Sequence, residues 1–288
     1  MKVERPKPDV AYELAMTHTR RCIAVAGCLA TVLAFASPAA AQFFGQPSDL
    51  PIGENYHVEV LGGMWSPSPN ISISSDAFGI AGTAINFASD LGIARERFGE
   101  VRLRLRPGRK HRFRIDYVPI RYSAQTVVER RLVFRGIAYD VGVPVSSTIS
   151  WTAWRLGYEY DIVHRSRGYF GIILEAKYTD VEASLDATFG REFARARGPI
   201  PAIGAIVRVY PLRVLAVTAE VSGVTLPRDL LESYSVEYVD IDVSGTLNFT
   251  EQLGAQFGYR SLDFSASSDE DAANLKLDGF YMGALLRF

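Results

Sequence analysis

Apolar residues recur at every second position at the end of the chain. Over the last eleven residues, Asp278 to Phe288, these positions hold Phe280, Met282, Ala284, Leu286 and Phe288. Because successive side chains of a β-strand point to opposite faces, the segment presents one continuous apolar ribbon. A strand needs about 9–11 residues to cross a bilayer, and this segment has that length. The pattern therefore predicts a membrane-spanning strand.

This ending resembles the closing strand of bacterial outer-membrane β-barrels, in which a terminal phenylalanine after alternating apolar residues is the assembly signal. The resemblance implies that the outer-membrane assembly machinery recognises the last strand through Phe288. It also implies an outer-membrane location in a Gram-negative bacterium, with membrane lipid as a partner. The resemblance extends over the mature chain as a pattern of strands, and it identifies no subfamily.

Residues 1–41 have the pattern of a cleaved export signal. The run Ile23–Ala36 is apolar, two arginines precede it, and small residues follow it up to Ala41. A basic region, an apolar region of this length and a small-residue cleavage site are the three parts of a secretory signal peptide. The expected organisation is a signal peptide over residues 1–41 cleaved near Ala41, a periplasmic lead-in over 42–54 and a barrel over 55–288.

Both cysteines, Cys22 and Cys28, lie in the predicted signal peptide. The mature chain then has none, which excludes disulfides, zinc–thiolate sites and cysteine nucleophiles. The signal peptide also holds five of the 31 basic and three of the 32 acidic residues, which leaves 26 against 29. This near-neutral balance gives no support for nucleic-acid binding. We expect no cofactor and a monomeric protein.

Alternating segments recur along the rest of the mature chain and predict ten strands. The plainest is Glu100–Arg106, in which apolar and charged residues alternate without interruption. An even number of antiparallel strands is the rule for single-chain bacterial outer-membrane barrels. The expected fold is all-β, an antiparallel up-and-down transmembrane barrel, with strands at Tyr56–Trp65, Glu100–Arg106, Arg112–Tyr117, Ile149–Asp161, Tyr169–Thr179, Ile200–Tyr210, Val214–Val224, Val239–Phe249, Leu253–Phe264 and Asp278–Phe288.

The connections between these strands alternate in length. Short turns follow the even-numbered strands, and mostly long connections follow the odd-numbered ones, among them polar loops at Asp186–Gly198 and Ser265–Asn274. Short periplasmic turns and long extracellular loops give this alternation, so both chain ends are expected in the periplasm. A hairpin inside Ser66–Arg97 or Tyr122–Ser147 would make twelve strands, and eight is the other alternative to ten.

Alternation alone does not distinguish a membrane barrel from a soluble one, because only the direction of the two faces differs. The export signal and the terminal Phe288 favour apolar side chains that face lipid. Aromatic residues near the periplasmic strand ends agree with a girdle at the membrane interface. The predicted girdle residues are Tyr56, Tyr158, Tyr160, Phe170, Phe249 and Phe288.

Opposite walls of the predicted lumen carry opposite charges. Arginines dominate the inward face of the second and third strands, and carboxylates dominate that of the seventh and eighth. One interpretation is a transverse field across a narrow pore, which would select small polar or charged solutes. The candidate constriction residues are Arg102, Arg104, Arg112, Arg114, Asp116, Glu220, Asp240 and Asp242.

The other interpretation is an interior that is filled by ion pairs. The same residues would then pair with one another and with further inward charges at Glu159, Glu175, Lys177, Arg208 and Arg260. A barrel of eight strands is just wide enough for its side chains to fill, whereas sixteen strands leave an aqueous channel. Ten strands lie near the filled limit, which favours the ion-paired plug.

The pattern therefore predicts a surface-exposed barrel that is at most a narrow passive pore. The alternative is a closed barrel, structural or adhesive, that binds ligands through its loops at 66–97 and 122–147. An outer-membrane hydrolase is less favoured, because a nucleophile needs a base within hydrogen-bond reach. The histidines of the mature chain, His57, His111 and His164, all fall near periplasmic strand ends, and no catalytic motif accompanies them.

Overall fold

The computed structural model describes residues 51–75, 82–187, 190–226, 235–268 and 271–288. The predicted signal peptide, its cleavage near Ala41 and the lead-in up to residue 50 lie outside these residues. The described part of the chain consists of β-strands and their connections. No described segment forms a helix that is long and apolar enough to cross a membrane.

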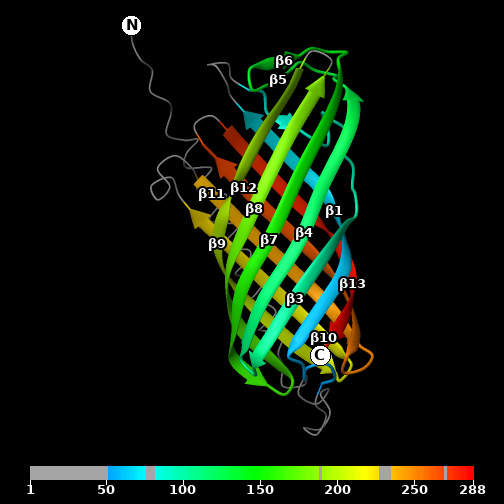
Figure 1. The fold of residues 1–288 in the computed structure, drawn as a ribbon, viewed down its shortest axis with the longest axis vertical. Helices are drawn as coiled ribbons and strands as arrows, with labels where there is room; N and C mark the ends of the chain where they lie inside the picture. Colours follow the sequence, from blue (N-terminus) through cyan, green and yellow to red (C-terminus); the bar gives the residue numbers. More distant parts are fainter. Residues whose placement is uncertain (1–50, 76–81, 188–189, 227–234, 269–270) are drawn as a thin grey trace, which may run out of the picture. The chain divides into compact units, whose positions relative to one another are not determined.

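Ten antiparallel strands close into a barrel (Figure 1). The ring closes where β13 pairs with β1, from Arg287 opposite Glu59 to Asp271 opposite Ser75. The all-β, antiparallel, up-and-down barrel that the sequence predicts is confirmed. Its strands are β1 (Val58–Ser75), β3 (Phe98–Gly108), β4 (His111–Val127), β7 (Pro144–Arg165), β8 (Gly168–Ala187), β9 (Gly190–Leu212), β10 (Leu215–Leu226), β11 (Ser235–Asn248), β12 (Leu253–Ser267) and β13 (Asp271–Arg287).

Three short strands lie in the long connections and do not enlarge the ring. β2 (Ile85–Asn86) adds only to the edge of β1, and β5 (Leu132–Phe134) pairs with β6 (Ile137–Tyr139) in a separate two-stranded sheet. The hairpin that the twelve-strand alternative requires therefore exists in the second connection, but it stands outside the barrel. The ring has ten strands.

The barrel has two unlike ends. The strands at the end that holds Val58 and Arg287, here the terminus end, are joined by connections of two to four residues at 109–110, 166–167, 213–214 and 249–252. The opposite end, here the distal end, carries the β5–β6 hairpin (Figure 1). The terminus end has short turns only, and the two longest connections, at 76–97 and 128–143, lie at the distal end, as the predicted alternation requires. The alternation is incomplete, because β8 and β9 are joined at the distal end by two residues and β12 and β13 by three.

Several strands extend farther toward the distal end than the sequence predicts. β8 and β9 run through most of Asp186–Gly198, and β12 and β13 run through most of Ser265–Asn274, so neither segment is the polar loop that was expected. β1 continues to Ser75, in agreement with the strand extension that the sequence allows at Asn70–Ser74 within the predicted loop Ser66–Arg97. These extensions lack an outward apolar ribbon, which was the signal used to recognise strands.

Strand β4 shows why that ribbon disappears. Near the terminus end its inward side chains are charged, as at Arg112, and its outward side chains are apolar, as at Phe113, which is 48% exposed. Toward the distal end its inward side chains are apolar, as at Ile120, and its outward side chains are polar, as at Arg121. The pleat is unchanged, so the same two faces meet different surroundings at the two levels.

A row of aromatic rings marks the level at which the faces exchange. Trp154 of β7 lies opposite Tyr178 of β8 in the sheet, and its ring centroid is 4.5 Å from that of Tyr117 on β4. Aromatic side chains gather at membrane–water interfaces. On the terminus side of this row, β7 has an outward apolar run from Trp154 to Ile162, and its length of about nine residues is what a membrane strand needs.

The outward apolar face predicted for the strands is therefore confirmed in the terminus half, whereas the distal half, which the sequence assigned mostly to connections, has its apolar side chains inside. Apolar side chains inside the distal half form a packed cluster, here the distal core, with Ile120, Tyr122, Ile149, Trp151 and Leu185 among its buried members. This half has the inward-apolar pattern of a soluble barrel. Burying apolar groups inside a barrel is favourable where the outer face meets water.

The first long connection fills a gap in the wall of the distal half. β3 begins only at Phe98, so among the described residues no barrel strand lies between β1 and β4 beyond that level, where only the two-residue β2 pairs with β1. Residues 82–97 occupy this place, and Phe87, Leu91 and Ile93 are buried in the distal core. The amide of Phe87 donates to the carbonyl oxygen of Ile71 at 2.9 Å. The connection is a structural wedge and not the free surface loop that the sequence predicts.

Removal of the Phe87 ring tests the wedge. Phe87 is fully buried, so Phe87→Ala is expected to lower the free energy of unfolding by about 3–5 kcal/mol through lost burial and the cavity left behind. Denaturant titration followed by tryptophan fluorescence measures it. Val141→Ala is the control, because Val141 is 66% exposed and its loss is expected to change stability by less than about 0.5 kcal/mol. Equal effects of the two changes would contradict the wedge.

Candidate functional site in the barrel interior

Charged side chains fill the interior of the terminus half. Ten basic and ten acidic side chains from the described residues point inward, each in at least one ion pair, so this ion-pair layer is electrically balanced. Its basic members are Arg102, Arg104, Arg106, Arg112, Arg114, Arg155, Lys177, Arg208, Arg260 and Arg287, and its acidic members are Glu54, Glu59, Glu100, Asp116, Glu159, Asp161, Glu175, Glu220, Asp240 and Asp242.

The structure brings predicted constriction residues from opposite walls into contact. Arg102 of β3 lies 3.0 Å from Asp242 of β11. Arg114 of β4 lies 2.5 Å from Glu220 of β10. The side chains that sequence reasoning placed on facing strands therefore meet across the barrel, and each contact closes part of the space between the walls. Their role as a constriction for solute stays a prediction.

The other predicted constriction residues pair along the wall. Arg104 of β3 binds Asp116 on the adjacent β4. Arg112 of β4 lies 2.7 Å from both Glu159 and Asp161 of β7. Charge-assisted hydrogen bonds of this kind are shorter and stronger than neutral ones. Arg102, Arg104, Arg112 and Arg114 carry like charges on adjacent strands, and each of them has a carboxylate partner in the structure.

Asp240 of β11 is the most connected acid of the layer. Its carboxylate accepts hydrogen bonds from Arg260 at 2.7 and 3.0 Å and from the hydroxyl of Tyr238 at 3.0 Å. Arg155 of β7 reaches the same carboxylate from across the barrel, and the Lys177 ammonium lies 3.6 Å away. Three cations therefore share one carboxylate in a site that is almost fully buried.

Sequence reasoning did not single out Arg155, although it bridges four carboxylates. They are Asp116, Glu175, Glu220 and Asp240. Arg155 has the same inward parity on its strand as Glu159, and this is the signal that could have found it. Its central role follows from the barrel geometry, because only ring closure brings β7 to face β10 and β11.

The segment before β1 closes the terminus end. The amide of Ile52 donates to the carbonyl oxygen of Arg213 at 2.8 Å, and Glu54 lies 3.1 Å from Arg208 inside the barrel. Gly53 adopts φ of +81° beneath Arg287, where a Cβ would collide with the guanidinium. The predicted lead-in is thus partly a plug over residues 51–57.

Tyr56 belongs to this plug and not to the predicted aromatic girdle. Its side chain is buried, because the segment before Val58 turns into the barrel and no longer follows the alternation of β1. The remaining predicted girdle residues follow the outward faces or lie at the chain end. Phe170, Phe249 and Phe288 are exposed, with Phe288 74% accessible.

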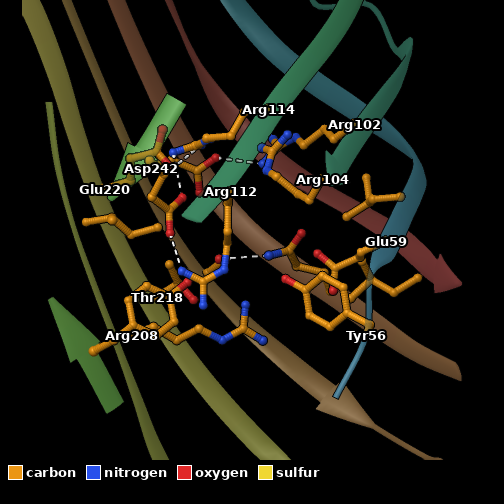
Figure 2. A pocket seen from close by; sticks show the side chains of 17 residues that line it. Tyr56, Glu59, Arg102, Arg104, Arg112, Arg114, Arg208, Thr218, Glu220 and Asp242 are labelled. Carbon is orange, nitrogen blue, oxygen red and sulfur yellow. Dashed lines mark hydrogen bonds and ion pairs between the residues drawn. The ribbon is translucent and has the colours of Figure 1, made fainter. Parts of the chain in front are cut away.

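Two small cavities lie among the described side chains of the barrel interior. The larger, about 60 Å³, lies within the ion-pair layer, and Figure 2 shows arginines from β3 and β4 and acids from β10 and β11 converging on it. The smaller, about 20 Å³, lies between the layer and the distal core beside Trp151 and Lys177. A buried water needs about 10–15 Å³, so these two cavities have room for a few water molecules.

The histidines do not form a catalytic arrangement with a hydroxyl nucleophile in the part of the chain that the structure describes. His111 Nδ1 lies 2.6 Å from the Tyr158 hydroxyl, and His164 Nδ1 lies 3.1 Å from Asp161. All three histidines lie at the terminus end, His57 just before β1. Among the same residues, no group of three His, Cys, Asp or Glu side chains is placed to hold a metal ion.

An ion pair fastens the wedge to the second long connection. Arg130 donates hydrogen bonds to both carboxylate oxygens of Asp90, at 2.9 and 2.6 Å, and to the carbonyl oxygen of Ala84 at 2.8 Å. These bonds hold the pKa of Asp90 below its ordinary value, against the opposing effect of partial burial, and the amide of Asn86 adds a further donor. The two predicted loops thus hold each other in place.

No family model and no curated protein matches this sequence. Solved structures do match. The outer-membrane protease OmpT of Escherichia coli aligns with a TM-score of 0.53 at 6% identity, over 84% of this chain and 100% of that chain. At this identity the similarity establishes the fold alone.

Two smaller barrels align with lower scores. The attachment invasion locus protein Ail of Yersinia pestis gives a TM-score of 0.36 at 10% identity, over 80% of this chain and 99% of its own. Neisserial surface protein A gives a TM-score of 0.35 at 12% identity, over 81% of this chain and 97% of its own.

Neutralising Asp240 tests the balance of the ion-pair layer. Asp240→Asn keeps the shape but leaves three buried cations without their shared carboxylate, so the free energy of unfolding is expected to fall by about 3–5 kcal/mol. Denaturant titration measures it. The control is Asp263→Asn on the adjacent β12, where the side chain is exposed and an effect below about 0.5 kcal/mol is expected. A similar loss in both variants would refute the special role of Asp240.

The Asp90–Arg130 pair predicts a pH-dependent wedge. Because the folded-state pKa of Asp90 is lowered, its contribution is complete above the unfolded-state pKa of about 4 and is lost as pH falls through the folded-state value. When the pH is lowered from about 6 to about 3, which spans the titration of a carboxyl group, hydrogen exchange of residues 84–93 is expected to become faster after correction for intrinsic rates. In Asp90→Asn the same amides should exchange faster than in the wild type at the higher pH. Their corrected rates should not change when the pH is lowered. Unaltered exchange in that variant would disprove the link.

Proposed function

We propose that this chain, whose fold is that of the bacterial outer-membrane β-barrels, is a closed barrel that binds partners through its distal half and does not conduct solute. The observation that carries the proposal is that the interior is filled twice along its axis. The ion-pair layer fills the terminus half, and the distal core fills the other. A permeating ion would need a water-filled path through both, in series.

The ion-pair layer supports closure by its balance and its contacts. Every one of its carboxylates is engaged by a cation, so no unpaired charge is left to attract a permeant ion. Opening a path would separate buried pairs, and breaking one such pair by removing a partner costs about 3–5 kcal/mol. The segment at 51–57 adds a further cover at the terminus end.

The distal core supports closure in a different way. Its buried members include Phe87, Phe134 and Tyr139, none of which has measurable exposure. An apolar constriction of this kind excludes water and with it any hydrated ion. If the ion-pair layer were loosened, the dry distal core would therefore still block the passage of a hydrated ion.

We place the protein in the outer membrane with the distal half in the extracellular space. The outward apolar run of β7 from Trp154 to Ile162 supports a lipid-embedded terminus half, with the Trp154 and Tyr117 rings at one border and the Tyr158 and His111 rings toward the other. The short turns at the terminus end support its periplasmic orientation. The distal half then stands clear of the membrane, where a partner reaches it. A hydrolytic role finds no support in the contacts of His111 and His164.

Planar-bilayer recording of the purified protein tests closure. The wild type is expected to give no single-channel steps. The double variant Arg102→Ala with Arg104→Ala opens space in the ion-pair layer only, so it should also remain silent because the distal core is intact. Reproducible wild-type steps that change in size in the double variant would overturn closure and establish the narrow pore.

A further inference from the structure

β9 runs well beyond the strand that pairs with it on one side. On its β8 side, pairing continues along the whole strand to Gly190, opposite Ala187. On its β10 side, pairing ends where Ile203 lies opposite Gly223, and β10 itself stops at Leu226. Among the described residues, the segment 190–202 of β9 therefore has a strand partner on one side only. Figure 1 shows β10 ending far below the start of β9.

The direction of the backbone groups along this edge follows from one hydrogen bond. The amide of Tyr210 donates to the carbonyl oxygen of Arg167 at 3.0 Å, one step beyond the pair of Val209 with Gly168 at which the β8–β9 pairing begins. In an antiparallel pair such residues alternate with residues whose backbone groups point the other way. Because the β8–β9 pairing is regular throughout, even-numbered residues of β9 bond to β8 and odd-numbered residues point to the open side.

Two prolines confirm this parity. Pro199 and Pro201 are odd-numbered, so the N–H groups that proline lacks would have pointed to the open side and not to β8. Proline is tolerated in strands where no ladder hydrogen bond is needed, and it protects edges from unwanted pairing. The edge is thus blocked next to the membrane, whereas positions 191, 193, 195 and 197 keep their N–H donors.

We propose that an extended segment of another protein adds to this edge of β9 as an antiparallel strand, over residues 191–197. Strand addition uses the main-chain donors and acceptors for affinity and the alternating side chains for specificity. A second copy in the same membrane would bring its β9 in the parallel direction, and parallel pairing is the less stable form. A soluble or disordered segment has no such restriction.

The side chains at the edge define the chemistry of the guest strand. Guest residues on the outer face would stand beside the exposed Phe193, Arg195 and Arg197. Arg195 already binds Asp180 of β8, so Arg197 is the cation beside which an acidic guest residue is most favourable. Guest residues on the inner face would stand beside Ala194 and Gly198, next to the distal core. A Cβ added at Gly198 meets no atom within 4 Å, so a large side chain has room there. The guest is therefore a strand that alternates acidic and apolar residues.

Binding of a synthetic peptide tests the inference. The probe is a fluorescent nonapeptide of alternating glutamate and valine, titrated into the purified full-length protein in detergent and followed by anisotropy. A peptide with lysine in place of glutamate is the charge control. Saturable binding of the acidic peptide is expected, with the basic peptide weaker by about tenfold.

Position 193 provides a matched pair of variants. Phe193→Ala and Phe193→Pro both remove an exposed ring, but only the second removes an N–H that points to the open edge. The alanine variant is expected to bind within about threefold of the wild type, and the proline variant about tenfold more weakly than the alanine variant. Unheated gel mobility checks that both variants form the barrel.

Several results would overturn the inference. They are absence of saturable binding to the wild type, equal affinity of the two variants, and equal affinity of the acidic and basic peptides. A wild-type dimer in sedimentation that Phe193→Pro dissociates would show that the edge pairs with a second copy instead. The inference rests on the distal half being accessible to a partner and not on closure. Channel steps together with peptide binding would refute closure alone, and a silent barrel without peptide binding would refute the strand addition alone.

Discussion

The need to hydrogen-bond every backbone group within hydrocarbon determines most of this structure. An open sheet edge in lipid would leave N–H and C=O groups without partners, and each of them costs several kcal/mol. The pairing of β13 with β1 removes that edge. Closure with ten strands also encloses a narrow interior, and side chains must fill it. The ion-pair layer is the answer that this sequence gives, because its outward positions are occupied by the apolar residues that meet lipid.

Outside the lipid the same strands obey a different rule. In the distal half, water satisfies the outer face, and the apolar side chains move to the inside, as Ile120 and Trp151 show. Closure is no longer compulsory there. The wedge at 82–97 covers a gap in the wall between β1 and β4, and among the described residues the edge of β9 before Ile203 has a strand partner on one side only. The two prolines lie on the part of that edge nearest to the membrane.

Much of the fold and part of the interior could be predicted from the alternation of residues. It correctly gave ten strands, a closing strand over Asp278–Phe288, which the structure extends back to Asp271, and the inward direction of Arg112 and Arg114. It failed where its assumption of a lipid surround failed, at the distal extensions and at Tyr56. The sequence showed which wall of the barrel carries the basic residues and which carries the acidic ones, but not which residues pair. The contact of Arg102 with Asp242, for example, depends on how the strands are staggered around the ring.

The sequence by itself determined which side chains share a face of each strand, because alternation is a property of the extended backbone. Only the tertiary structure decided which medium each face meets, which charges pair across the barrel and where a strand outruns its neighbour. These depend on ring closure and on the level of the membrane along the barrel. Neither is a local property of the chain, so the same alternating pattern encodes an ion-paired interior at one level and an apolar core at the next.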